Sequence, residues 1–165
     1  RAPQVEIVTG LKNVYAFEFY DQDMVGVKGY DYRILEEIKR HSVWIVSKTS
    51  NANTITHFLK GSMQAIRRVE ADLSAAFPSA EISLRKVSLV SAIGRDLGST
   101  AVLLQAIKAL ADAGISPLGV HDLIRKVDLQ VVVEQADFDA TIKALHKGLI
   151  ENWTPAQRET LHAAA

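Results

Sequence analysis

Apolar residues in the first half of the chain recur at every second position in some stretches and at every third or fourth position in others. The first spacing is typical of strands with one buried face, and the second is typical of amphipathic helices. The stretches from 14 to 84 predict the element order β-α-β-β-α-β, with strands at 14–19, 42–46, 54–59 and 82–84 and helices at 30–40 and 62–77. Two further strands, 6–8 and 87–90, are expected on either side of this unit.

The same order of patterns returns in the second half. Ser99 is expected to cap a helix that ends at Gly114, and Asp137 is expected to cap the last helix. Strands are expected at 115–120 and 129–133, separated by a polar turn.

The two halves can be overlaid on each other. Gly29 aligns with Gly98 and Ile38 with Ile107, whereas chance similarity of two amphipathic stretches is the alternative explanation. The overlay favours an α+β fold built from two ferredoxin-like βαββαβ modules, each an antiparallel sheet with its helices on one face.

Composition narrows the function classes. The chain has 165 residues, of which 48% are hydrophobic, and 19 basic residues balance 19 acidic ones. This net charge of zero argues against nucleic acid or an anionic membrane surface as a partner, because both need a basic surplus. No apolar run is long enough for a membrane helix, and no ribonucleoprotein aromatic motif is present. Phe17 and Phe19 share one strand face, which we assign to the core.

The residue types also limit the chemistry. The chain has no cysteine, which excludes disulfides and thiolate metal sites and is compatible with the cytoplasm. The five histidines include no i, i+4 pair, so we expect them to be surface or strand residues rather than metal ligands. The first residue, Arg1, is neither an initiator methionine nor the start of a signal peptide, which favours a fragment or a processed chain.

The loop from Met24 to Tyr30 carries two glycines before the first helix. It matches neither the phosphate-binding nor the dinucleotide-binding glycine pattern. Bare amides at a helix start attract a carboxylate, although a simple turn with positive φ explains the glycines equally well. Asn51 and Asn53 follow the next strand, where they either orient a ligand or bond to their own turn. The carboxylates of Asp21, Asp23 and Asp31 are expected to be caps or solvated charges.

Several segments resemble the C-terminal regulatory region of bacterial aspartate kinases, which consists of tandem amino-acid-sensing ACT domains. The resemblance covers nearly the whole chain. It rests on 8–11, 87–94, the stretch Ala109-Leu110-Ala111-Asp112-Ala113-Gly114-Ile115, and 131–146, while 47–56 is similar to the ectoine-associated aspartate kinases.

The resemblance implies a domain organisation. The first ACT module spans 14–86 and the second spans 87–152, and the N-terminal strand at 5–10 joins the second module's sheet. Residues 153–165 form a C-terminal tail, in which Pro155 suits the first turn of a short helix.

The resemblance also implies a function. Two copies of the chain pair through their first modules, and a small amino-acid effector, lysine or threonine, binds at the seam. Val46 stands where the lysine-sensitive branch carries an aspartate, which removes a partner for the lysine ammonium. The fragment itself is not catalytic and needs no cofactor or metal, since ATP and Mg²⁺ would serve an absent kinase domain that phosphorylates aspartate. The implied effector-binding residues are Met24, Gly26, Gly29, Tyr30, Asp31, Ile45, Val46, Asn51 and Asn53.

Two alternatives stay open at this point. The same fold can serve purely as a dimerisation module with an empty site. A small acylphosphatase-like enzyme would need an arginine inside a phosphate-cradling glycine loop, and Lys28 is the only basic residue in the first loop.

Overall fold

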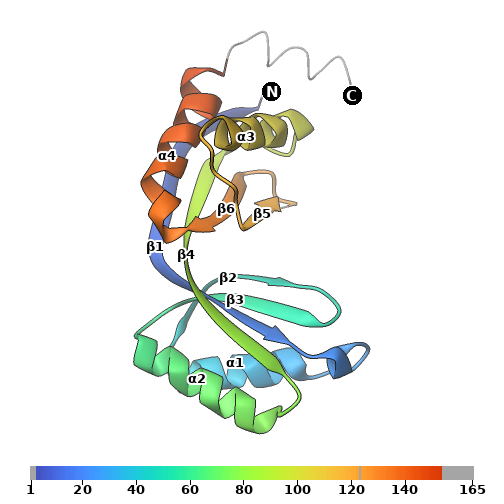
Figure 1. The fold of residues 1–165 in the computed structure, drawn as a ribbon. Coiled ribbons are helices and arrows are strands. Elements are labelled where there is room, and N and C mark those ends of the chain that lie inside the picture. Colours follow the sequence, from blue (N-terminus) through green and yellow to red (C-terminus); the bar gives the residue numbers. More distant parts are fainter. Residues whose placement is uncertain (1–2, 123, 154–165) are drawn as a thin grey trace. The chain divides into compact units, whose positions relative to one another are not determined.

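A computed structural model describes residues 3–122 and 124–153. These residues divide into two compact units, one formed by 13–86 and the other by 3–12 together with 87–122 and 124–153. We call these the inserted module and the outer module. Figure 1 shows that two long strands, β1 (Gln4–Tyr20) and β4 (Glu81–Arg95), each contribute to both modules.

The inserted module is an antiparallel sheet with two helices on one face (Figure 1). After β1 the chain forms a short 3-10 turn, η1 (Gln22–Met24), and then helix α1 (Tyr30–Arg40). Strands β2 (Trp44–Ser50) and β3 (Thr54–Lys60) make a hairpin, and helix α2 (Met63–Ala76) leads into β4. The hydrogen-bonded strand order is β2-β3-β1-β4, which is the ferredoxin-like order expected from the sequence.

The core of the inserted module lies between this sheet and its two helices. Phe17 and Phe19 are fully buried, as the shared strand face predicted, and they meet Leu59 of β3 and Ile34 of α1 in one apolar cluster. Burial of each such side chain contributes about 1.5–3 kcal/mol. Leu35 and Met63 belong to the apolar stripes of their helices, but they are 37% and 43% exposed because they lie at the edge of those stripes.

The outer module repeats the plan with a different chain order. Helix α3 (Thr100–Asp112), strands β5 (Gly119–Asp122) and β6 (Asp128–Glu134), and helix α4 (Phe138–His146) follow β4. A second short 3-10 turn, η2 (Gln135–Asp137), precedes α4, and a π-helical turn, η3 (Lys147–Glu151), continues it. The strand order β1-β4-β6-β5 makes the N-terminal part of β1 the fourth strand of this sheet.

The long strands correct the sequence-based expectation of separate short ones. The stretches 6–8 and 14–19 form one strand, and so do 82–84 and 87–90. Gly10 does not break β1. A Cβ at this position would lie 2.5 Å from the Leu89 carbonyl oxygen and 2.7 Å from Phe138, so the glycine allows close packing.

Helix starts agree well with the sequence signals. The hydroxyls of Ser62 and Ser99 accept hydrogen bonds from the N–H groups of Ala65 and Val102. Asp137 occupies the cap position of α4, but its side chain makes no capping hydrogen bond. The strand expected from residue 115 begins only at Gly119.

The predicted tail helix after Thr154 lies outside the described residues. In the described part of the chain, no helix combines the length and the apolar character that crossing a membrane requires.

Candidate functional site

A hollow of about 290 Å³ opens in the inserted module where the loop before α1 faces the β2–β3 turn. We call it the glycine-loop hollow. Two segments that are some twenty residues apart in the sequence build it, so folding of the module brings them together. Its lining residues are Met24, Gly26, Val27, Gly29, Tyr30, Asp31, Ser50, Asn51, Ala52 and Ile55.

Both glycines of the loop have the left-handed conformation that L-residues avoid. The φ angle is 76° at Gly26 and 103° at Gly29, and a Cβ at either position would meet no atom within 4 Å. The backbone conformation, not crowding, therefore requires glycine here. Gly29 is the N-cap of α1 and offers no capping side chain, so the first-turn N–H groups of this 11-residue helix have no side-chain cap. Such a helix start attracts an anion.

A buried carboxylate holds the loop in shape. Asp21 is 2% exposed. Its Oδ1 accepts the Asp23 N–H at 2.9 Å, and its Oδ2 accepts the hydroxyls of Ser79 at 3.2 Å and Tyr30 at 3.5 Å. The Tyr30 ring stacks on Phe77 with a centroid distance of 5.0 Å. Burial, followed by the charge of Asp21, raises the pKa of the Tyr30 phenol above its usual value, so this hydroxyl stays a hydrogen-bond donor.

The turn that forms the other wall is stabilised by its own side chains. Asn51 Oδ1 accepts the N–H groups of Asn53 at 3.2 Å and Thr54 at 2.9 Å. Asn53 Oδ1 accepts the Thr54 hydroxyl at 3.1 Å. Both amide oxygens therefore serve the turn, which is the structural alternative that the sequence left open.

An ion pair that the sequence analysis did not anticipate lies beside the hollow. Lys48 Nζ of β2 is 2.5 Å from Asp31 Oδ2, while Asp31 Oδ1 is buried and has no hydrogen-bond partner in the described chain. His57 lies opposite Lys48 in the β2–β3 register and is fully buried. Burial, followed by repulsion from Lys48, lowers the pKa of His57 to about 4, so its ring is neutral at pH 7.

Not every residue implied by the resemblance lies in this hollow. Six of them line it, namely Met24, Gly26, Gly29, Tyr30, Asp31 and Asn51. Asn53 lies in the adjoining turn, and Val46 occupies a bulge where the register shifts between Ile45 and Ser47. Ile45 lines a separate apolar hollow of about 550 Å³ with Leu35 and Trp44. Lys48 and His57 were missed because only the folded module brings β2 and β3 close to Asp31 of α1.

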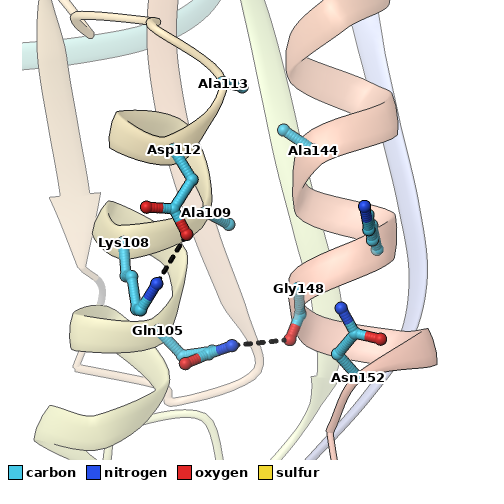
Figure 2. A pocket seen from close by; sticks show the side chains of 9 residues that line it. Gln105, Lys108, Ala109, Asp112, Ala113, Ala144, Gly148 and Asn152 are labelled. Carbon is cyan, nitrogen blue, oxygen red and sulfur yellow. Dashed lines mark hydrogen bonds and ion pairs between the residues drawn. The ribbon is translucent and has the colours of Figure 1, made fainter.

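The outer module has a hollow of its own, of about 330 Å³, between α3 and the α4–η3 segment. In Figure 2, Gln105 points across it and donates to the Gly148 carbonyl at 3.2 Å. Lys108 is paired with Asp112 at 2.5 Å on the same helix. A Cβ at Gly148 would lie 2.6 Å from the Ala109 Cβ, so these helices approach closely, and the Gln105 hydrogen bond joins them.

Comparison with known proteins shows which proteins this chain is similar to. The chain is 43% identical over 149 residues to the aspartate kinase Ask_Ect of Stutzerimonas stutzeri (strain A1501). The matched region covers 90% of this chain but only 31% of that protein. No protein-family model matches the chain.

Solved structures agree on the fold. The regulatory subunit of aspartate kinase from Thermus flavus superimposes with a TM-score of 0.74 at 15% identity, covering 88% of this chain and 99% of that one. The aspartate kinase of Clostridium acetobutylicum gives a TM-score of 0.79 at 14% identity, covering 90% of this chain and 35% of that one. E. coli aspartokinase III in complex with lysine and aspartate gives a TM-score of 0.75 at 17% identity, covering 91% of this chain and 34% of that one.

Together the sequence match and the fold confirm the resemblance to the C-terminal regulatory region of aspartate kinases. The likeness to Ask_Ect in particular agrees with the ectoine-associated type. The chain spans about a third of the length of that curated relative.

Proposed function

We propose that this chain, as the regulatory region of an aspartate kinase, binds an amino acid of the aspartate family in the glycine-loop hollow. The hollow carries the proposal because it places an uncapped helix start beside a partly unpaired carboxylate. The first-turn amides of α1 would hold the ligand's carboxylate, and Asp31 Oδ1 would accept from its ammonium group. Both charged ends of a free amino acid would then have partners.

The charge beside the hollow favours one effector over another. Lys48 already neutralises Asp31, and no acid stands at Val46, so the side-chain ammonium of lysine would have no partner and would face a like charge. A hydroxyl side chain can donate and accept without that repulsion. Of lysine and threonine, we therefore expect threonine to bind more tightly. E. coli aspartokinase III has been solved in complex with lysine, which makes lysine the informative competitor.

The second part of the proposal is a homodimer through the inserted modules. The edge strand β2 exposes 76% of Trp44 and 42% of Ile45 beside the half-exposed Leu35, around the 550 Å³ apolar hollow. An unpaired strand edge flanked by apolar side chains is a pairing surface, and a second copy of the same edge is its natural complement.

In the whole protein, the effector would act on a kinase domain beyond this chain that transfers phosphate from ATP, with Mg²⁺, to aspartate in the cytoplasm. Binding would favour one arrangement of the regulatory region and so change kinase activity.

Isothermal titration calorimetry with threonine, lysine and methionine tests the effector. We expect saturable threonine binding that Gly29→Ala abolishes, because φ at this position is 103° and the substitution would distort the helix start. Gly114→Ala is the matched control: its φ is 71° with the same open space, but it lies in the outer module. Equal loss in both variants would contradict the assignment to this hollow.

Sedimentation velocity separates the two parts of the proposal. Trp44→Glu should convert a dimer to a monomer by placing a charge in the paired edge. A dimer that binds none of the three amino acids would instead support the alternative of a purely structural module.

A further inference from the structure

A second constellation lies at the opposite end of α1 from the glycine-loop hollow. Glu37 and His41 are one helical turn apart on α1, and Asp72 faces them from α2. The potential ligand atoms of the three side chains all lie within 4.8 Å of one another. His41 Nε2 is 2.6 Å from Asp72 Oδ2.

The backbone fixes this arrangement. The His41 N–H donates to the Glu37 carbonyl at 3.2 Å and so completes the last turn of α1. Side chains four residues apart on a helix point to the same side, which directs both toward α2. Two packed helices therefore determine where the three side chains meet.

Glu37 is the member of the group that a simple ion-pair interpretation does not explain. Its side chain is 3% exposed, and Oε2 is buried without a hydrogen-bond partner in the described chain. The guanidinium of Arg40 approaches Oε2 at 2.9 Å as an ion pair, but Arg40 is 58% exposed. A buried carboxylate beside a second carboxylate needs more positive charge than a solvated arginine supplies.

We propose that Glu37, His41 and Asp72 form a site for a divalent transition-metal ion of the zinc class. One imidazole and two carboxylates are a ligand set that Zn²⁺ accepts, with water in the fourth position. The ion would sit between the three groups, displace the direct His41–Asp72 contact and neutralise the buried Glu37. It would join the C-terminal end of α1 to the middle of α2 as a structural clamp. The inference does not depend on effector binding, which involves the other end of the helix.

Cobalt substitution tests the site on the whole chain. After treatment with a chelator, the protein is titrated with Co²⁺ and followed by visible absorption, and Zn²⁺ then displaces the cobalt. We expect the visible d–d absorption of Co²⁺ to show low-symmetry coordination and to saturate at one equivalent of the metal. Zn²⁺ should also raise the midpoint of thermal unfolding in a concentration-dependent way, because the ion binds the folded state.

Variants locate the site. His41→Ala and Asp72→Asn each remove one ligand from a partly exposed position and should weaken metal affinity by about 100-fold or more. His146→Ala is the matched control, because His146 also lies at a helix end but faces the single carboxylate of Glu151 at 2.8 Å. Near-ultraviolet circular dichroism verifies that each variant is folded.

Two results would overturn the proposal. Absence of saturable binding by folded wild-type protein would leave His41–Asp72 as an ion pair only. Binding that survives His41→Ala but disappears in His146→Ala would place the metal elsewhere.

Discussion

The inserted and outer modules share one fold, but the corner before the first helix is built differently in each. In the inserted module Gly29 caps α1 without a side chain. In the outer module the aligned Gly98 is followed by Ser99, whose hydroxyl accepts the Val102 N–H, and the Lys126 side chain would lie 2.5 Å from a Cβ at Gly98. The first corner therefore has no side-chain cap on its first-turn amides, while the second corner is capped by Ser99 and filled by Lys126. Two modules with the same fold can thus differ in whether the same corner is open or packed.

Several glycines of the two modules show a related difference, although Gly114 of the outer module shares the positive φ and the open space of Gly26 and Gly29. In the inserted module Gly26 and Gly29 are required by positive φ in open space. In the outer module Gly94 and Gly148 are required by close contact. Substitutions can test this contrast directly.

The largest effect is expected at Gly94, where a Cβ would lie 2.0 Å from the Gln4 carbonyl oxygen. Gly94→Ala should destabilise the chain by roughly 4 kcal/mol or more, because backbone would have to move against backbone. Gly26→Ala should cost only about 1 kcal/mol from the positive φ. Urea unfolding measures the free energy of unfolding of both variants. Equal losses of stability would contradict the expected difference between the crowded and the open glycine.

Lowering the pH should destabilise the inserted module through His57. The pKa of His57 is lowered from 6.5 to about 4 in the folded chain. Between these two pH values the imidazole is therefore protonated in the unfolded state but neutral in the folded state. Stability is therefore retained above pH 6.5 and falls as the pH drops toward 4, by up to about 3 kcal/mol. His57→Leu should flatten this dependence in urea titrations at several pH values. An unchanged slope would show that another group is responsible.

Loosening the anchor of the glycine loop should have a smaller effect on stability. Asp21→Ala leaves the Tyr30 and Ser79 hydroxyls without their acceptor, which should cost about 2 kcal/mol. The effector affinity should fall as well, since the loop shape depends on this carboxylate. Ser79→Ala, which removes only one donor, is the control and should cost less in both chemical unfolding and calorimetry.

The smallest expected effect compares the helix caps. Ser99→Ala and Ser62→Ala should each cost about 1 kcal/mol, because both hydroxyls accept one N–H of the first turn. Thermal unfolding should show similar shifts for the two. A much larger shift for Ser99 would mean that its role in filling the outer corner exceeds capping.

Much of the fold was predictable from the sequence because its signals are local. Alternating apolar residues placed Phe17 and Phe19 in the core, and serine caps located two helix starts. The continuity of β1 was not predicted, because only the structure shows Leu89 and Phe138 packed against Gly10 in the middle of the strand.

The site was predictable in part for the same reason. The glycine loop has a local signature, and the family resemblance added the strand and turn that face it. Contacts between a strand and a helix, such as Lys48 with Asp31, and between two helices, such as His41 with Asp72, have no local signature. They arise only when residues distant in sequence are brought together.

The interrupted chain order of the outer module has a consequence for biogenesis. Residues 4–12 leave the ribosome before the inserted module, yet their sheet partners are made only after residue 86. Closing so long a loop has an entropic cost. The inserted module removes most of that cost if it folds first, because its two ends, near Asn13 and Lys86, lie on the neighbouring strands β1 and β4. Slow maturation of the inserted module would therefore delay the whole chain.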